Sequence, residues 1–286
     1  MIKKIVTHPG GAHKDDFLAV CVLIARSGAP VERRVPKEDE KKNPEIALVD
    51  IGGSHEPEFL NFDHHHFPRE HAPTCALSLV LQHLNLYKDA LMFCDWLEPA
   101  EWFDSRGPNK TAEWLGVSRE AVARLNSPID VTLLRRFARQ SELKSGDILY
   151  EVMRFVGEDL VEFVQTARRR LDRTASLVKT WEMELSGENK KVVYLPRGDM
   201  IPEEPSASIA RYVRAQKLEQ SVVALVYPDR RGDGYGITRF NDHPKLDFSK
   251  VGDQEDVHFA HTTGFMCKTT ATSIDRLQAL IRGAWG

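Results

Sequence analysis

The order of apolar and polar positions near the start of the chain predicts an α/β unit. Short apolar runs with polar or glycine borders predict strands at residues 3–7, 31–35 and 46–51. Residues 15–26 are almost wholly apolar and too long for a typical strand, so we interpret them as a buried helix that ends near Gly28. Strand, helix, strand and strand in this order predict a mostly parallel sheet flanked by helices on both faces.

The middle of the chain has a helical pattern. Residues 75–181 are predicted to be mainly helical, and residues 147–182 repeat apolar positions at intervals near 3.6, which indicates one long helix. The polar, glycine-containing break at residues 186–189 predicts a domain boundary. We therefore expect a first domain over residues 1–186, which includes this helical linker, and a smaller α/β domain over residues 187–286.

The second predicted domain alternates strands and helices. Residues 227–234 combine proline, aspartate and glycine in the manner of a hairpin turn. The predicted strands are 191–195, 220–227, 234–240 and 256–261, and the predicted helices are 206–216 and 271–283.

Composition narrows the class of protein. The chain has 286 residues, of which 42% are hydrophobic and 28% charged, as is usual for globular domains. A net charge of −3 predicts no general attraction to nucleic acid or acidic membranes, so such binding requires a local patch. The four cysteines form no C-x-x-C pair, which argues against a zinc cluster and a disulfide framework. The sequence opens without a signal peptide and has no run that could span a bilayer, so we expect a cytoplasmic protein without membrane contacts.

Side chains that bind divalent metals follow three strand-like segments. Imidazoles and carboxylates are ligands for borderline and hard cations, and open α/β sheets place ligands at the carboxyl ends of their strands. The sequence therefore predicts a metal site at one edge of the sheet. The three clusters are His8, His13, Asp15 and Asp16 after the first strand, Asp50 at the end of the apolar run 47–49, and Asp63-His64-His65-His66 after 59–62.

Several of these residues also have a structural reading when taken alone. His8 could be a hydrogen-bonded structural histidine, and Asp50, which precedes two glycines, could cap a turn. Asp15 and Asp16 could be acids of the first turn of the following helix. The run 63–66 differs, because four such residues rarely follow one another in a solvated loop. Its position repeats that of the other two clusters, which favours a shared metal site.

The ligand types favour a pair of divalent ions. Catalytic pairs lie about 3.5–4 Å apart and need a shared carboxylate with nitrogen and oxygen ligands from several segments. Mixed imidazole and carboxylate ligation suits manganese, iron, cobalt or zinc, whereas magnesium is usually held mainly by oxygen. Two Mn²⁺ ions are therefore our first choice. The sequence supplies at least His8, His13, Asp15, Asp50 and His64 as ligands.

In their order, these motifs resemble the melanocyte-proliferating-gene family, a branch of the DHH phosphoesterase superfamily. The first part of the resemblance consists of Thr7-His8-x-Gly10-x-x-His13-x-Asp15-Asp16, Val49-Asp50-x-Gly52-Gly53 and Phe62-Asp63-His64-His65. It continues at residues 103–107, 222–228 and 257–265.

The resemblance implies a DHH-like catalytic domain that binds the metals, and a C-terminal domain that binds substrate at a cleft between the two. It implies manganese-dependent hydrolysis of phosphodiesters, with a 3′–5′ exonuclease activity on RNA or short oligonucleotides. Two alternatives remain open. One is a pyrophosphatase or small-nucleotide phosphatase with the same site, and the other is a protein that binds metal or nucleotide without turnover.

The resemblance also implies roles for individual residues. Asp50 would bridge the metals, His64 would ligate one of them, and His65 would face the scissile phosphate as a catalytic group. Asp104 would be the last acidic ligand, with Asp95 as the competing candidate. His8, His13 and Asp15 would complete the metal site, and the substrate contacts would be His65, His66, Arg239, His261 and Lys268.

Three positions depart from the family pattern. His13 stands where the superfamily usually has the first aspartate of Asp-x-Asp, and His66 stands where the family commonly has glutamine. After Gly264-Phe265, the family's paired glycines are replaced by Met266-Cys267-Lys268. The last change removes a flexible backbone cradle for anions, and Lys268 could supply charge in its place.

Overall fold

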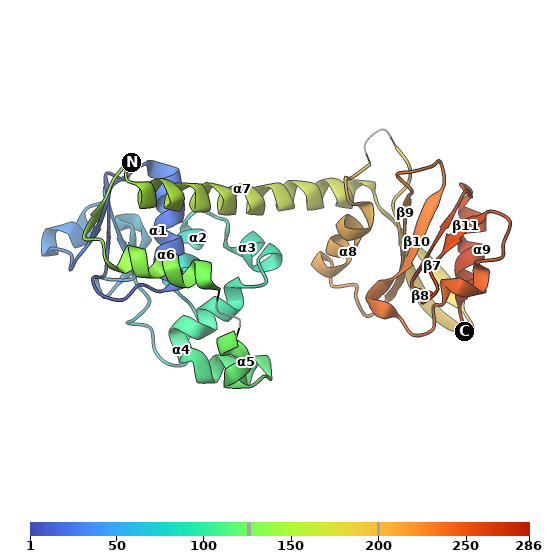
Figure 1. The fold of residues 1–286 in the computed structure, drawn as a ribbon, viewed down its shortest axis with the longest axis horizontal. Helices are drawn as coiled ribbons and strands as arrows, with labels where there is room; N and C mark the ends of the chain where they lie inside the picture. The colour runs from blue at the N-terminus through green and yellow to red at the C-terminus, as the bar shows by residue number, and fades with distance from the viewer. Residues whose placement is uncertain (125–126, 199–200) are drawn as a thin grey trace. The chain divides into compact units, whose positions relative to one another are not determined.

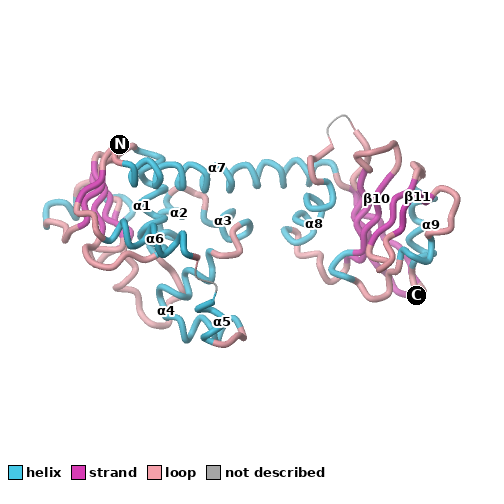
Figure 2. The backbone as a smooth tube through the Cα atoms, in the orientation of Figure 1, coloured by secondary structure: helices cyan, strands magenta, loops and turns pink. Residues whose placement is uncertain are grey.

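The chain folds into two compact units, Met1–Ala167 and Arg168–Gly286, in a computed structural model. The structure describes residues 1–124, 127–198 and 201–286 (Figure 1). The strands gather into two sheets, one in each unit (Figure 2). Among the described residues, no helix combines the length and apolar character needed to cross a bilayer.

The first unit contains a six-stranded, mostly parallel sheet, which confirms the predicted α/β class. Its strand order is β4-β5-β3-β1-β2-β6; β1, β2, β3 and β5 run parallel, and the edge strands β4 and β6 are antiparallel. The strands are β1 (Lys4–Thr7), β2 (Val31–Arg33), β3 (Ile46–Val49), β4 (His55–Glu56), β5 (Asn61–Phe62) and β6 (Glu142–Leu143).

Helix α1 (Lys14–Ser27) packs on this sheet and forms the centre of the core, as its apolar run predicts. Phe17, Val20 and Leu23 of α1 belong to the same buried cluster as Ile5 of β1, and α2 (Ala76–His83) packs beside α1. The helix ends at Gly28, whose φ of 67° is the left-handed conformation that commonly closes a helix. The short helical turn η1 (Glu38–Lys42) contacts β3.

Further helices complete this unit. They are α3 (Tyr87–Phe93), α4 (Leu97–Leu115), α5 (Arg119–Arg124), α6 (Pro128–Ala138), the short η2 (Pro57–Phe59) and α7 (Ile148–Leu177), whose last turns belong to the second unit. Helix α4 is interrupted at Gly107, where φ is 78° and Pro108 follows. Helix α7 approaches α1 so closely that a Cβ at Gly157 would lie 2.0 Å from the carbonyl oxygen of Cys21. Only glycine fits at this contact.

The second unit is a six-stranded sheet with the order β11-β12-β10-β9-β8-β7, and all its pairs except β8–β9 are antiparallel. Helices α8 (Pro205–Ala215) and α9 (Ile274–Ala284) lie on opposite sides of it (Figure 1), and each covers a separate apolar cluster. The strands are β7 (Lys179–Leu185), β8 (Glu188–Tyr194), β9 (Val222–Pro228), β10 (Tyr235–Arg239), β11 (Val257–Ala260) and β12 (Met266–Thr269). Short helical turns η3 (Phe240–Asp242) and η4 (Phe248–Val251) follow β10.

The predicted extent of the long helix was wrong at its carboxyl end. Helix α7 stops at Leu177, and residues 179–185 form β7, in which Met183 and Leu185 are buried and alternate with exposed residues. Val178 and Trp181 are three residues apart and continue the helical period, so the pattern extended the predicted helix past Leu177 into β7. A boundary at 186–187 would cut the β7–β8 hairpin, and the two compact units divide inside α7 instead.

Candidate metal centre

The candidate metal centre lies where three parallel strands end. In the register of the sheet, Thr7 of β1 is paired with Val49 of β3, and Val49 with Phe62 of β5. The residue that directly follows each strand is His8 after β1, Asp50 after β3 and Asp63 after β5. Because parallel strands end at a common edge, this register brings the three sequence clusters together.

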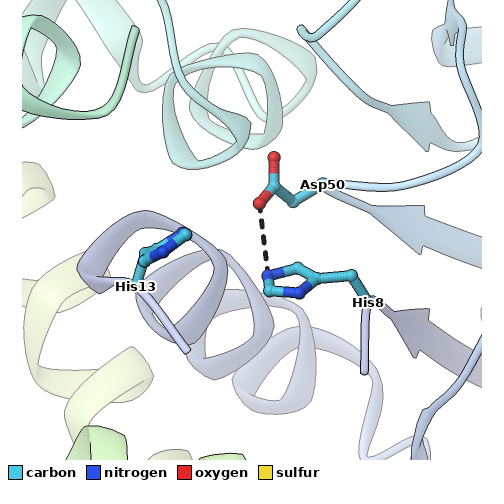
Figure 3. Close-up of side chains that lie close together, drawn as sticks. All are labelled: His8, His13 and Asp50. Carbon is cyan, nitrogen blue, oxygen red and sulfur yellow. Dashed lines mark ion pairs between the residues drawn. The ribbon is translucent and has the colours of Figure 1, made fainter. Parts of the chain in front are cut away.

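Asp50 is the residue that the clusters share. The residue is 3% exposed, and its backbone has a φ of 55°, a left-handed conformation that is uncommon for residues other than glycine. One oxygen, Oδ2, lies 3.4 Å from Nε2 of His8. The other, Oδ1, lies 3.2 Å from Nε2 of His64 and 3.5 Å from Nδ1 of His65. The carboxylate thus faces histidines on both sides, and Figure 3 shows its approach to His8.

Asp16 positions both histidines of the first cluster. Its Oδ1 accepts a hydrogen bond of 2.7 Å from the backbone N–H of His13, as an acid of the first helical turn does. Its Oδ2 lies 3.2 Å from Nε2 of His8, and this contact raises the pKa of His8 against the opposing effect of burial. The sequence analysis interpreted Asp16 as a residue of the first helical turn, which accounts for its contact with the backbone of His13 but not for its contact with His8.

Asp15 and Asp104 form a second side of the site together with His13. One ligand atom from each of these three residues lies within 4.8 Å of the others. Oδ2 of Asp15 accepts a 3.3 Å hydrogen bond from the backbone N–H of Ala76. Burial, and then repulsion from Asp104 and Asp50, raises the pKa of Asp15 well above its ordinary value. A cation would remove that repulsion.

The structure brings Asp104, and not Asp95, to the centre. Oδ2 of Asp104, on α4, lies 2.8 Å from Nε2 of His64. Asp95 is exposed in the turn before α4, and among the described residues it belongs to no cluster of metal-ligand type. Burial acts to lower the pKa of His64, but Asp104 and Asp50 raise it to about 10. Without a metal, these carboxylates therefore hold a proton on His64.

The clustered atoms fit a cation better than they fit one another. They lie at ion-pair distances, yet within the described part of the chain several of them have no correctly angled hydrogen bond. A buried polar atom without a partner destabilises a fold by roughly 1–3 kcal/mol, so such a collection needs a ligand. The atoms are His8 Nε2, Asp15 Oδ1, Asp16 Oδ2, Asp50 Oδ1, His64 Nε2 and Asp104 Oδ2.

Three groups of residues could each hold an ion. Asp50 belongs to the first two groups and His13 to the first and third, so adjacent ions would share ligands. Figure 3 shows the first group, with the rings of His8 and His13 on the same side of Asp50. The groups are His8, His13 and Asp50; Asp50, His64 and His65; and His13, Asp15 and Asp104.

His65 is held in place by Asp63. Oδ1 of Asp63 lies 2.8 Å from Nδ1 of His65, and the carboxylate also accepts the backbone N–H groups of Gly53 at 2.6 Å and His65 at 3.0 Å. Burial acts to raise the pKa of Asp63, but these hydrogen bonds lower it to about 2. Because Nδ1 of His65 also lies beside Asp50, the geometry allows both a ligand and a phosphate-facing role.

A hollow of about 200 Å³ adjoins the candidate metal centre. His64, His65 and Asp104 line it, together with Arg69 and Arg106. Arg106 donates a hydrogen bond to the carbonyl oxygen of His71, which joins α4 to the loop after the Asp-His-His-His run. The hollow therefore places positive charge beside the candidate metal ligands.

The remaining predicted substrate residues already have partners. His66 is exposed and packs against Phe67, outside every ligand group found among the described residues. In the second unit, Arg239 is paired with Asp242 at 3.0 Å, and Nζ of Lys268 lies 2.8 Å from Asp229. Nδ1 of His261 lies 2.9 Å from Oγ1 of Thr263. Their contact with substrate stays a prediction.

Sequence reasoning missed Arg33, which holds the first ligand loop. This side chain on β2 is 5% exposed and donates to the carbonyl oxygens of Gly10 at 3.2 Å, Gly11 at 3.1 Å and Phe137 at 3.1 Å. Its guanidinium carbon lies 4.5 Å from the centre of the Phe137 ring. Arg33 stands next to Arg34 in the predicted strand 31–35, and the sequence pattern does not show which of the two arginines is buried.

Comparison with known proteins supports the family resemblance in the first unit. Residues 4–79 match the family model MYG1_exonuc, described as Uncharacterised protein family (UPF0160). The matched segment is similar to that family and includes His8, Asp50 and His64. No curated protein matches the chain.

Two solved structures are similar to the chain at low scores. One is described as a DHH domain of a member of the s1p family of ribosomal proteins, with a TM-score of 0.34, 14% identity, and coverage of 98% of this chain and 85% of that one. The other is RecJ from Thermus thermophilus in complex with Mn²⁺, with a TM-score of 0.30, 14% identity, and coverage of 99% and 51%.

Proposed function

We propose that this protein is a metal-dependent phosphodiester hydrolase that acts as a 3′–5′ exonuclease on RNA or short oligonucleotides. The observation that carries the proposal is the buried carboxylate of Asp50, whose two oxygens face His8 on one side and His64 on the other. A carboxylate shared between two sets of ligands is the arrangement that a pair of catalytic ions requires. The name of the family that residues 4–79 match designates an exonuclease, which supports the choice of reaction.

The residues present fit two ions of the manganese type. Asp50 would bridge, with His8 and His13 on one side and His64 and Asp104 on the other; Asp15 stands near His13 and Asp104. The mixture of imidazole and carboxylate favours Mn²⁺, with Co²⁺, Zn²⁺ or Mg²⁺ as alternatives. When bound, two such ions would supply an activated water and would stabilise negative charge on the phosphoryl oxygens.

The chain's own residues would orient the phosphodiester. His65, fixed by Asp63, would donate a proton to a phosphate oxygen or to the leaving group. Arg69 and Arg106 in the adjoining hollow would attract the phosphate, and guanidinium groups suit its geometry. His66, Arg239, His261 and Lys268 remain our candidates for further substrate contacts.

A metal-substitution assay tests the function directly. Purified protein would be treated with a chelator and supplied in turn with Mn²⁺, Mg²⁺, Co²⁺ or Zn²⁺, with bis-p-nitrophenyl phosphate, pyrophosphate or 5′-labelled short RNA as substrates. We expect hydrolysis of the diester and stepwise shortening of RNA from its 3′ end, fastest with Mn²⁺. Turnover of pyrophosphate alone would favour the pyrophosphatase alternative, and tight metal binding without any hydrolysis would favour the non-catalytic one.

A further inference from the structure

A second hollow, of about 400 Å³, lies within the C-terminal unit between the end of α7 and the start of α8. We call it the arginine hollow, because Arg170 and Arg173 of α7 and Arg211 of α8 line it together with Glu203 and Glu204. It shares no residue with the candidate metal centre. None of its residues belongs to the motifs that carry the family resemblance.

The two helices present these arginines because their other faces are buried. Arg170 and Arg173 are three residues apart on α7 and exposed, while Thr174 is buried and donates a hydrogen bond to the carbonyl oxygen of Arg170. On α8, Val213 packs into the apolar cluster beneath the helix, and Arg211 is half-buried. The core thus fixes the backbone from which the guanidinium groups extend.

These guanidinium groups have no anionic partner within the described residues. Neither Glu203 nor Glu204 forms an ion pair with them, although both carboxylates line the same hollow. Other arginines of this unit are paired, as Arg276 is with Asp256 at 2.6 Å. Three like charges in one hollow repel one another unless an anion lies between them.

The start of α8 adds to the positive potential. Its N-cap residue, Glu204, makes no capping hydrogen bond with its side chain, and residues of the first turn line the hollow. The amino end of a helix carries partial positive charge that favours phosphate groups. The arginines and the helix end therefore act in the same direction.

We infer that the arginine hollow binds the phosphate backbone of a single-stranded polynucleotide. Guanidinium groups bind phosphate oxygens in a bidentate manner, and a hollow of about 400 Å³ has room for more than one phosphate. The chain as a whole has a net charge of −3, so binding of a nucleic acid needs a local basic site of this kind. The choice of a polynucleotide over another phosphate compound rests on the proposed function.

Binding without metal tests this inference separately from hydrolysis. The affinity for a fluorescent single-stranded RNA of about 12 nucleotides, a length that such sites commonly cover, would be measured by anisotropy in a chelator at several salt concentrations. We expect the double variant R173A/R211A to bind about tenfold more weakly. The slope of log affinity against log salt should fall by roughly 0.7 for each phosphate that the variant no longer neutralises.

Matched variants separate the hollow from general charge. R214A removes the same charge from the same helix at an exposed position outside the lining, and it should bind as the wild type does. R173K/R211K keeps the charge and should recover most of the affinity. E204Q removes a negative charge from the lining and should strengthen binding. Thermal unfolding of each variant shows whether the fold is retained.

Several results would overturn the inference. Unchanged affinity and salt slope in R173A/R211A would remove the hollow from the binding surface, and an equal loss in R214A would show that charge anywhere on α8 suffices. If a mononucleotide displaced the RNA completely and bound as tightly as the RNA does, the arginine hollow would be a site for small phosphate compounds instead. Hydrolysis of bis-p-nitrophenyl phosphate with Mn²⁺ should be unchanged in the double variant. If the wild type lacks that hydrolysis, the proposed function fails while the binding result stands.

Discussion

The two units of the chain use charged side chains in opposite ways. At the strand ends of the first unit, Asp50 and Asp104 are crowded against His64 with buried atoms that have no correctly angled hydrogen bond among the described residues. In the second unit, Lys268 and Arg239 are already paired with carboxylates. The first arrangement is unstable without a ligand, whereas the second is satisfied as it stands.

The difference shows where binding energy is available. A cation that enters the first unit would relieve repulsion among buried carboxylates and complete the contacts of several atoms at once. A phosphate that meets Lys268 or Arg239 must first displace Asp229 or Asp242, so the gain per contact is small. In the second unit, the arginine hollow is the exception, because within the described residues its arginines have no carboxylate to displace.

The substitution D50N should cause the largest loss of activity at the candidate metal centre. Loss of the bridging charge should reduce hydrolysis of the diester by about 10³-fold or more, since metal activation supplies several kcal/mol and each 1.36 kcal/mol is tenfold in rate. Asparagine tolerates the left-handed backbone at this position, so the fold should persist. The measurements are kcat with Mn²⁺ and thermal unfolding.

The thermal stability of D50N without metal also tests the bridging role of Asp50. Burial raises the pKa of Asp50, so the charged carboxylate opposes folding when no metal is bound. In a chelator, D50N should therefore unfold at the same temperature as the wild type or higher. A variant that is less stable without metal, or active with Mn²⁺, would contradict the bridging role.

H65A should lower kcat by about 10²-fold and keep bound metal, as expected for a general acid or phosphate-orienting group. H66A is the matched control, because it removes the same ring from the same exposed loop outside the ligand groups. It should have a smaller effect, seen mainly in KM. Elemental analysis of manganese decides the matter: absence of metal from H65A would make His65 a ligand.

R33K should weaken Mn²⁺ affinity by about tenfold, within the range for residues that position ligands indirectly. Lysine keeps the charge but cannot reach the carbonyl oxygens of Gly10, Gly11 and Phe137 with one planar group. R34K is the control, because Arg34 is paired with Glu40 and does not contact that loop. Metal titration by calorimetry should separate the two variants, and equal affinities would show that Arg33 only supports the fold.

H261A should have one of the smaller kinetic effects, a rise of about threefold in KM for a phosphodiester, without a change in Mn²⁺ affinity. The ring of His261 already contacts Thr263 in the free protein, so a new contact with substrate would replace an existing one and add little binding energy. Unchanged kinetics would remove His261 from the substrate-binding residues. A fall in metal affinity would instead place it at the metal centre.

The pH dependence of stability should change sign when metal is added. The pKa values of His8 and His65 are raised by Asp16 and Asp63, and that of His64 is raised to about 10, so the folded protein binds more protons than the unfolded chain. Their contribution is full below pH 6.5, the unfolded value, and disappears as pH rises towards 10.

In a chelator, the melting temperature should therefore fall between about pH 6.5 and 9. With Mn²⁺ it should hold or rise over the same range, because metal binding displaces those protons and tightens as they leave. Differential scanning calorimetry measures both series. If melting temperature changed with pH in the same way with and without Mn²⁺, the histidines that bind these protons would not be the groups that bind the metal.

Much of the first unit could be predicted because its signals are local. The apolar runs indicated β1, α1 and β3, and the parallel order placed His8, Asp50 and His64 at one edge. The choice between Asp104 and Asp95 could not be made from the sequence, since it depends on how α4 packs against the strand ends. Arg33 was missed for a similar reason, because its acceptors are backbone carbonyls that carry no sequence signal.

The alignment of Thr7, Val49 and Phe62 across three strands has a consequence for how this protein can change over evolutionary time. Each strand rises about 3.3 Å per residue, and successive side chains point to alternate faces of the sheet. A single inserted or deleted residue in β3 would move Asp50 by one step and turn it to the other face. Core substitutions that preserve strand length leave the ligands in place. Lineages of this protein should therefore vary freely in the identity of these strand residues and hardly at all in their number.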